Sequence, residues 1–486
     1  MKIINPPDKV IMQLTGSKVY DSKIKYRFLK WVGVIQVDEE NESHLKIFGK
    51  PERGTILHNY ITGETLFFEP EEDFRDYMEH LVKGLFFVPY DHDDKKTVHQ
   101  LRSALRLMNT KKEVTSFKIL TTTDCNARCF YCYEAGIKKH DMSLETADKV
   151  AEYIIKKSGK KKVTLAWFGG EPLMGTEVID RICSGVSVAG MEYISVMTSN
   201  GYLFDDEMII RAKERWHLNN IQITLDGTEE VYNRVKAYKD AKDKESPFRR
   251  VMGNIKDLAG AGVRVNIRLN LTKENFGDLK ELLDEISEMA GILPDRKKIN
   301  VYASPLFEDM EKDDGEKEKL ITNTDILTEM IRERGLESRS YKAIKLKISG
   351  CMADNDAHRG VSPIGDIIKC EHHIYDKSIG SIEVPKGLSE ACEPQPAGDF
   401  GYNEDDEMIR EWKKPMESGD ICDDCPAFPS CYRLKNCPVS HICSPGEKKQ
   451  QLGKNESLIL QKTAEVLRDT DHNNTFIDKN KEMTKM

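Results

Sequence analysis

Between about Ser116 and Leu306 the sequence alternates short apolar runs with amphipathic segments, and this alternation limits the fold most strongly. The apolar runs have the length and β-branched content of strands; they are Phe117–Leu120, Val163–Phe168, Tyr193–Thr198, Ile221–Leu225, Val263–Leu269 and Ile299–Ala303. The segments between them have helical periodicity; they are Ser143–Lys157, Thr176–Val186, Asp205–Trp216, Phe248–Ala259 and Leu279–Met289. Such alternation predicts an α/β fold in which parallel strands are joined by right-handed crossovers. Because six strands are too few to close an eight-fold barrel, we predict an open, partial (β/α)6 TIM barrel with its site on the loops after the strands.

The sequence on either side of this repeat does not show the same alternation of strands and helices. Ile56–Tyr60 and Thr65–Phe68 predict a hairpin, and Glu71–Lys83 predicts a helix. We expect an N-terminal α+β module at 1–112, the barrel at 113–310, a helical linker at 311–350, a small cysteine-rich domain at 351–450, and a C-terminal helix with a polar tail at 451–486. The N-terminal module is a docking element, a lid for the barrel or a packing extension.

Composition excludes several classes of protein. The net charge of -9 disfavours a nucleic-acid-binding surface. No apolar run approaches the roughly 20 residues that span a bilayer, and the first residues do not form a secretory signal. We therefore expect neither a nucleic-acid nor a membrane partner, and we predict a cytoplasmic protein, in which thiols stay reduced.

The chain has twelve cysteines, which in a reducing compartment indicate metal binding rather than disulfides. Three of them, Cys125, Cys129 and Cys132, follow the first predicted strand with the spacing C-x3-C-x2-C. Three thiolates can hold three irons of a 4Fe–4S cluster and leave the fourth iron open to a small molecule. A structural zinc site needs a fourth protein ligand, for which His140 is the nearby candidate, so we favour the iron–sulfur cluster.

This spacing, the aromatic Tyr131 before the third cysteine and the position after a strand resemble the radical S-adenosylmethionine (SAM) superfamily. The resemblance extends over about residues 115–307, because polar and glycine-rich segments follow the second, third and fourth strands. It implies that the cofactor is bound by residues of the cysteine loop, of the strands and of the strand ends: Tyr131, Gly169, Gly170, Glu171, Ser199, Asn200, Thr224, Asp226 and Arg268. For Thr224 and Asp226 a plain strand-to-helix turn is the alternative, and Arg234 and Lys236 compete with Arg268 for the cofactor carboxylate.

The resemblance also implies the chemistry. The catalytic cysteines Cys125, Cys129 and Cys132 would hold the cluster whose electron cleaves SAM into methionine and a 5′-deoxyadenosyl radical. That radical abstracts a hydrogen atom from the substrate, while the protein binds, orients and excludes side reactions. An electron donor of the flavodoxin or ferredoxin type is the expected redox partner.

A second set of cysteines occupies the C-terminal third of the chain. Cys351 and Cys370 bracket Gly365 as C-x13-G-x4-C, and later members are Cys422, Cys425, Cys431, Cys437 and Cys443. The pattern is similar to the SPASM domain of radical enzymes that modify peptides, which holds two auxiliary 4Fe–4S clusters, although the third gap of the later run is x5 here rather than x3. A zinc ribbon is the alternative interpretation.

The SPASM resemblance assigns ligands as follows: Cys422, Cys425, Cys431 and Cys443 to the distal cluster, and Cys351, Cys370 and Cys437 to the proximal one. This set is one ligand short of two complete clusters, so we expect an open iron in the proximal cluster; Cys392 as an eighth ligand is the alternative. Three 4Fe–4S clusters are therefore predicted in total. Cys183 lies on the apolar face of a predicted helix and is expected in the core.

These features lead to a predicted function. We expect a radical SAM peptide maturase that forms a cross-link, most simply a cysteine thioether, in a ribosomally made precursor peptide. The leader of that peptide is expected to add as a strand to the edge of the N-terminal hairpin. The alternatives are a sulfatase-type maturase that forms formylglycine, and a non-catalytic metal-cluster scaffold.

Overall fold

The computed structural model describes residues 1–16, 18–110, 113–159, 161–239, 246–306, 314–336, 344–349, 351–374, 377–382, 404–414, 425, 427–435, 437, 452–453 and 455–470. The predicted ligands Cys422 and Cys443 and the alternative ligand Cys392 lie outside these residues. The chain divides into two compact units: unit 1 is Met1–Thr110, Ser340–Gly350 and Pro415–Met486, and unit 2 is Lys111–Arg339 and Cys351–Lys414.

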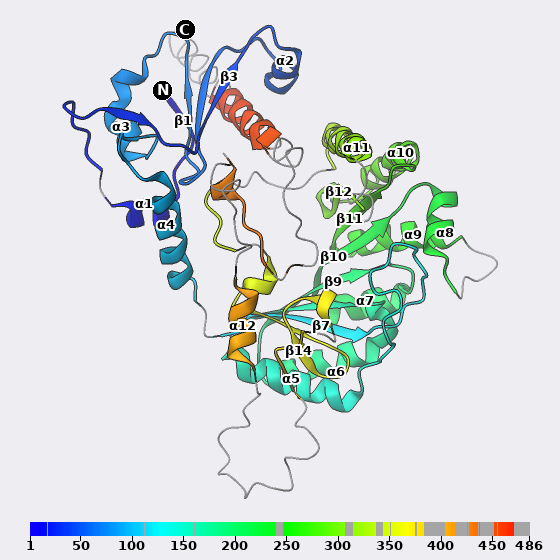
Figure 1. Ribbon diagram of the computed structural model, residues 1–486. Helices are drawn as coiled ribbons and strands as arrows, with labels where there is room; N and C mark the ends of the chain where they lie inside the picture. Colours follow the sequence, from blue (N-terminus) through cyan, green and yellow to red (C-terminus); the bar gives the residue numbers. More distant parts are fainter. Residues whose placement is uncertain are drawn as a thin grey trace, which may run out of the picture. The chain divides into compact units, whose positions relative to one another are not determined.

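Unit 2 is built on a nine-stranded sheet with the order β12-β11-β10-β9-β8-β7-β13-β14-β15 (Figure 1). Its first six strands are those of the predicted repeat: β7 Ser116–Thr122, β8 Val163–Gly169, β9 Tyr193–Ser199, β10 Leu218–Leu225, β11 Arg264–Leu271 and β12 Ile299–Pro305. Each pairs in parallel with its neighbours. The predicted partial (β/α)6 barrel is therefore confirmed, and the carboxyl ends of these strands meet at one edge.

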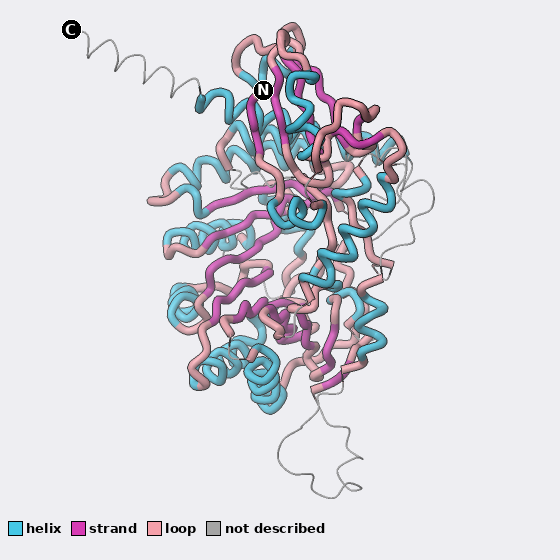
Figure 2. The backbone as a smooth tube through the Cα atoms, turned by 90° about the vertical axis from the view of Figure 1, so that its left-hand side faces the viewer, coloured by secondary structure: helices cyan, strands magenta, loops and turns pink. Residues whose placement is uncertain are grey.

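Helices connect the strands and line one side of the sheet (Figure 2). They are α5 Leu144–Ser158, α6 Thr176–Val188, α7 Asp206–Glu214, α8 Glu229–Lys236, α9 Pro247–Gly260 and α10 Phe276–Gly291, with α11 Asp314–Glu333 after β12. Local sequence explains where two of them begin: the Ser143 side chain accepts a hydrogen bond from the Thr146 amide, and Pro247 stands in the first turn of α9. The short helix α8, which ends at Lys236, was not predicted.

The segment that begins at Cys351 joins the same sheet. It contains β13 His358–Val361, β14 Asp366–Ile368, β15 Gly380–Ser381 and α12 Asp406–Trp412, with 3-10 turns at Met352–Asp354 and Glu371–His373. β13 pairs in parallel with β7, and β14 and β15 follow as antiparallel strands. Cys351 and Cys370 therefore flank a hairpin that extends the barrel sheet.

Unit 1 contains a four-stranded antiparallel sheet with the order β1-β5-β4-β3 and a two-stranded pair β2-β6. The strands are β1 Lys2–Asn5, β2 Tyr26–Phe28, β3 Val32–Val37, β4 Gly54–Asn59, β5 Thr65–Phe68 and β6 Phe87–Pro89. The helices are α1 Lys9–Thr15, α2 Glu42–Phe48, α3 Met78–Lys83 and α4 Asp94–Met108, with a helix over 455–470 and 3-10 turns at Phe74–Tyr77 and Phe428–Ser430. Among the described residues, no helix has the length and apolar content needed to cross a membrane.

The predicted hairpin is present as β4 and β5, but these are the two inner strands of the sheet. The expectation that a peptide adds to the hairpin edge is therefore wrong, because both hairpin strands are already paired on both sides. The outer strands β1 and β3 flank the hairpin. The helix predicted over Glu71–Lys83 is shorter than expected, since only Met78–Lys83 is α-helical.

A buried histidine connects β4 to the segment 344–349. The His58 ring lies 2.8 Å from the Thr65 hydroxyl and 2.8 Å from the Ile344 carbonyl oxygen, and its side chain is fully buried. Burial lowers the pKa of His58 to about 4, even though the hydrogen bond to Ile344 opposes this shift. The neutral ring is therefore part of the folded unit.

This arrangement predicts a pH dependence of stability. The folded pKa of His58 lies below its unfolded value of 6.5, so between about pH 6.5 and 4 the unfolded chain binds more protons. The free energy of unfolding of unit 1 should fall as the pH drops through this window, by an amount on the order of 3 kcal/mol. Urea unfolding at several pH values, monitored by hydrogen exchange of the β4 amides, measures this free energy. His58→Gln, which does not titrate, should flatten this dependence; an unchanged slope would contradict the assignment.

Candidate functional site

The loop with the first three cysteines leaves β7 and packs against the end of β8. The Gly170 amide donates to the Thr122 carbonyl oxygen at 3.1 Å, and the Glu171 amide donates to that of Asp124 at 2.9 Å. A Cβ on Gly169 would lie 2.1 Å from the Thr122 oxygen, and Gly169 also has a φ of +122°. A Cβ on Gly170 would lie 2.1 Å from the Asp124 oxygen. The two glycines are thus needed for close approach of the β8 backbone to the cysteine loop.

Glu171 is fully buried and holds the end of β9. Its carboxylate accepts hydrogen bonds from the Ser199 hydroxyl at 2.8 Å, from the Asn200 amide at 2.8 Å and from the Leu173 amide at 3.1 Å. Burial raises the pKa of Glu171 to about 7, against the effect of these bonds. The Asn200 side chain in turn donates to the Asn126 side chain at 2.7 Å and lies 3.8 Å from the Cys125 sulfur. Three predicted residues, Glu171, Ser199 and Asn200, therefore form one network with the cysteine loop.

Tyr131, Asp226 and Lys236 form a second network on the other side of the loop. The Tyr131 hydroxyl donates to the Asp226 carboxylate at 2.8 Å, the Lys236 ammonium donates to the Tyr131 hydroxyl at 3.0 Å, and the Lys236–Asp226 ion pair spans 3.1 Å. Asn270 donates to the Asp226 carboxylate at 3.1 Å, and Asn275 donates to the Asp226 backbone carbonyl oxygen at 2.7 Å. These three side chains form a largely buried triangle, so the loop is fixed at Tyr131 by Asp226, which directly follows β10, and by Lys236 of α8.

The predicted residues Thr224 and Arg268 are direct neighbours on β10 and β11. One Arg268 terminal nitrogen donates to the Ser304 hydroxyl at 3.2 Å, whereas its Nε is buried without a hydrogen-bond partner among the described residues. The Asn126 side-chain nitrogen and the Asn270 side-chain oxygen are also buried and also have no hydrogen-bond partner among the described residues. Unpartnered buried polar atoms are costly, so their presence at this edge fits a polar ligand.

The three cysteines of the loop are half-buried thiols. Burial raises the pKa of Cys125 to about 12 and raises that of Cys132 above its usual value, so both are protonated in the absence of a metal. Within the described ranges, no three His, Cys, Asp or Glu side chains already converge as a metal site. The donor set, three soft sulfur ligands on one loop, fits three corners of a 4Fe–4S cluster.

A cavity of about 460 Å³ opens beside Tyr131 and Asp226. Its wall also includes the exposed ring of Phe130 and the turn after β11; the lining residues are Phe130, Tyr131, Asp226, Val231, Arg234, Val235, Thr272, Lys273, Glu274, Asn275 and Asp278. The cavity lies at the carboxyl ends of the strands, where ligands of parallel barrels bind. Arg234 reaches this cavity and is exposed, whereas Lys236 on the same helix is buried.

The hairpin that carries Cys370 contacts the segment around the first cysteine set. The Glu371 carboxylate pairs with the Lys118 ammonium at 2.7 Å, and the His372 ring packs on the Tyr133 ring with centroids 4.1 Å apart. Cys351 and Cys370 belong to unit 2, whereas Cys425, Cys431 and Cys437 belong to unit 1. Their assignment to two auxiliary clusters stays a prediction.

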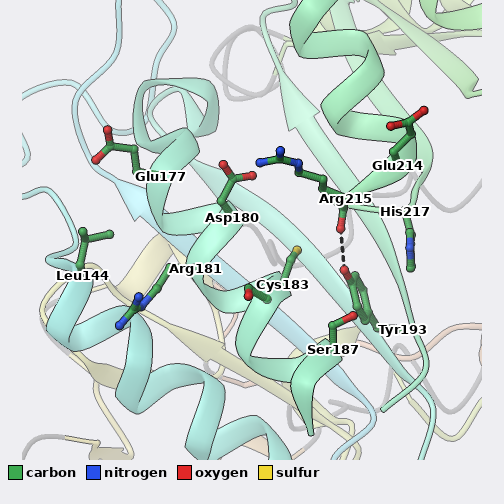
Figure 3. Close-up of a pocket in the computed structure, with 11 residues that line it drawn as sticks. Leu144, Glu177, Asp180, Arg181, Cys183, Ser187, Tyr193, Glu214, Arg215 and His217 are labelled. Atoms are coloured by element: carbon green, nitrogen blue, oxygen red, sulfur yellow. Dashed lines mark hydrogen bonds between the residues drawn. The ribbon is translucent and has the colours of Figure 1, made fainter. Parts of the chain in front are cut away.

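A separate hollow of about 640 Å³ lies at the opposite, amino-terminal end of β9 and β10 (Figure 3). Tyr193 and His217 stack with centroids 4.8 Å apart, and the Tyr193 hydroxyl donates to the Arg215 carbonyl oxygen at 2.6 Å. Cys183 lies in its floor and is 2% exposed, which confirms the prediction that this cysteine is buried. The residues that line this hollow include none of the predicted ligands.

Most of the residues that meet at this site are predicted from the sequence. The residues that hydrogen-bond to them are not. Asn126, Asn270 and Asn275 were not predicted, and Lys236 was considered only for the cofactor carboxylate. Asn270 could have been found because it lies two positions after Arg268 on a strand and shares its face. The pairing of Lys236 with Tyr131 had no sequence signal, since 105 positions separate the two residues.

Comparison with known proteins finds a family model that matches part of the chain. Residues 119–286 match the family model described as the Radical SAM superfamily. A probable GTP 3′,8-cyclase of Methanococcus vannielii is 25% identical over 231 residues, which cover 43% of this chain and 70% of that protein. A Fe-coproporphyrin III synthase of Methanosarcina barkeri is 26% identical over 200 residues, which cover 41% of this chain and 46% of that protein.

The fold is also similar to a solved structure. Native anSMEcpe with bound AdoMet and a Cp18Cys peptide superimposes with a TM-score of 0.50 at 16% identity, and the match covers 74% of this chain and 99% of that chain. The same protein with bound AdoMet and a Kp18Cys peptide gives a TM-score of 0.52 at 15% identity. At this identity the comparison establishes the fold.

The close approach of the β8 end to the end of β7 and its cysteine loop can be tested by substitution. Gly169→Ala should lower the free energy of unfolding by at least about 2 kcal/mol and should reduce iron binding, because its Cβ would strike the Thr122 carbonyl oxygen and its φ is positive. Thermal unfolding and iron analysis measure both effects. The matched control is Gly253→Ala in α9, where a Cβ meets nothing within 4 Å and should stabilise by about 1 kcal/mol. Equal thermal stability and equal iron content in the two variants would contradict the role of Gly169.

Proposed function

We propose that this chain, an enzyme of the radical SAM superfamily, modifies a peptide by removing a hydrogen atom from one of its carbons. The observation that carries the proposal is the site edge itself, where a three-cysteine loop adjoins unpartnered buried polar atoms and an open cavity. A protein of the same fold that binds AdoMet together with a peptide supports a peptide substrate. The cross-link, most simply a cysteine thioether, is part of the proposal.

The residues of the site have separate roles in this proposal. Cys125, Cys129 and Cys132 hold the cluster, and the cluster with SAM supplies the 5′-deoxyadenosyl radical. Arg268 and Asn270 offer buried polar atoms to the cofactor from β11. Glu171 holds the end of β9 through three accepted hydrogen bonds, and its remaining acceptor site is available to the cofactor ammonium group. Gly169 and Gly170 keep the cysteine loop close to β8.

The second cysteine set supplies the remaining metal sites of the proposal. Closing a thioether removes a second electron and a proton from the peptide, and an auxiliary cluster is a suitable acceptor for that electron. Cys351, Cys370, Cys425, Cys431 and Cys437 are the described candidates, and an open proximal iron would bind a substrate thiolate. An external flavodoxin or ferredoxin would reduce the first cluster. The cytoplasm, which keeps these thiols reduced, is the proposed compartment.

The outer strand β3 is the proposed docking edge for the leader of the substrate. The Tyr60 amide donates to the Trp31 carbonyl oxygen, so the alternate positions 32, 34 and 36 direct their backbone groups away from β4. A groove of about 210 Å³ runs along this edge, and Leu452 and Glu456 form part of its wall. An extended peptide could hydrogen-bond to β3 and place alternate side chains in this groove.

Removing one ligand tests the radical cluster. Cys125→Ala should abolish 5′-deoxyadenosine formation under dithionite and should lower iron from about twelve to about eight atoms per chain, the content of two remaining clusters. The matched control is Cys183→Ala, which removes a buried thiol elsewhere in unit 2 and should leave iron content unchanged while costing about 1 kcal/mol of stability. A wild-type protein that makes no 5′-deoxyadenosine would favour a non-catalytic scaffold.

A proline substitution tests β3 as the docking edge for the substrate. Val34→Pro should weaken binding of a leader peptide, because proline removes an outward-directed amide without removing a β3–β4 hydrogen bond. Val34→Ala keeps that amide and is the control. Fluorescence anisotropy with a labelled precursor peptide measures binding, and mass spectrometry shows the product. Loss of a free thiol with two hydrogens indicates a thioether; an aldehyde on the peptide instead would indicate formylglycine.

A further inference from the structure

The buried lysine of α8 calls for an explanation beyond stability. Lys236 and Asp226 have side chains that are 4% and 3% exposed. Burying an ion pair removes both charges from water, and a well-packed apolar pair of the same size is often at least as stable. The Lys236 ammonium is also surrounded by aromatic rings, 5.7 Å from the Tyr131 ring centre and 5.6 Å from that of Tyr232. The pair also makes polar contacts with the Tyr131 hydroxyl that an apolar replacement could not make.

Its contacts are directed at the cysteine loop. Within the triangle, the hydroxyl of Tyr131 both donates to Asp226 and accepts from Lys236. The main chain adds two further connections: the Arg128 amide donates to the Lys236 carbonyl oxygen at 2.7 Å, and the Lys239 amide donates to that of Asn126 at 3.0 Å. The loop from 126 to 131 is thus attached to the end of α8 at three points.

The backbone at this attachment is strained. Ala237, the residue after Lys236, has a φ of +43° and a ψ of +58°, the left-handed conformation that alanine rarely adopts. The turn that it makes allows Lys236 to stay in the core while Tyr238 stacks on Tyr202 with centroids 4.4 Å apart. A conformation of this kind persists where the surroundings hold it in place, and such positions concentrate at functional sites.

We propose that Lys236 is a positioning residue for the loop that carries Cys129 and Cys132, and that it acts together with Asp226 through the Tyr131 hydroxyl. Tyr131 stands between these two cysteines in the sequence, so fixing its hydroxyl fixes the backbone that connects them. The same pair sets the charge next to the cluster, because its cation and its anion both lie beside the loop. This inference rests on the proposed cluster at Cys125, Cys129 and Cys132.

The test compares variants of the reconstituted full-length protein by three measurements: iron retained after gel filtration, the EPR spectrum of the reduced cluster, and its reduction potential. Lys236→Met should lower cluster affinity by roughly tenfold, as loss of an outer-shell partner does. It should also shift the potential to a more negative value, because it leaves the anion of Asp226 uncompensated. Asp226→Asn should shift the potential in the opposite direction, because it leaves the cation.

Two variants keep the proposal testable if Lys236→Met does not fold. Tyr131→Phe removes only the hydroxyl and should lower iron retention with little change in potential. Lys236→Arg keeps the charge and should restore part of the retention. The control Lys256→Met makes the same chemical change on the exposed face of α9 and should behave like the wild type.

The outcomes separate this inference from the proposed function. Potentials that shift in the same direction in Lys236→Met and Asp226→Asn, or iron retention in Tyr131→Phe equal to that of the wild type, would overturn the inference and leave the cluster assignment intact. A wild-type protein that retains no iron at this loop would overturn the cluster and the proposed function together.

Discussion

The arrangement of the site depends on the contact between the end of β8 and the loop after β7. Two backbone hydrogen bonds continue the pairing of these strands past their ends, from Gly170 to Thr122 and from Glu171 to Asp124. Because this contact fixes the cysteine loop against β8, the carboxylate of Glu171 falls beside Ser199 and Asn200 at the end of β9. One short stretch of backbone therefore aligns the ends of three neighbouring strands.

The repeating part of this structure could be predicted from sequence because its signals are local. Apolar runs predict all six strands of the repeat, and helical periodicity predicts most of the helices that connect them. The cysteine loop and the glycines after β8 were found by their spacing. Pairings between distant segments had no such signal: β13 adds to β7, and β3 and β1 add to the outside of the predicted hairpin. Strand partners are chosen by register and shared burial, which a single segment does not reveal.

Buried charges attach the segment after Cys351 to the barrel. Glu404 accepts from the Arg359 guanidinium at 2.8 Å, from the Lys157 ammonium at 2.8 Å and from the Tyr153 hydroxyl at 2.8 Å. Despite its burial, these partners lower the pKa of Glu404 to about 2, so it is charged at neutral pH. Together with Lys118–Glu371, these ion pairs give the hairpin of Cys370 a fixed orientation against the barrel, whereas apolar contacts alone would permit sliding.

The pairing of β13 with β7 has a consequence for synthesis of the chain. Ser116 and His358, which contact each other across these strands, are 242 positions apart. A ribosome adds ~5–20 residues per second, so one edge of β7 emerges roughly 12–50 s before its partner. During that interval the edge of β7 that later pairs with β13 is unpaired and exposed, and such an edge is a template for association with other chains. Yield in the cell should therefore depend on how fast the ribosome completes the hairpin and on chaperones that cover this edge meanwhile.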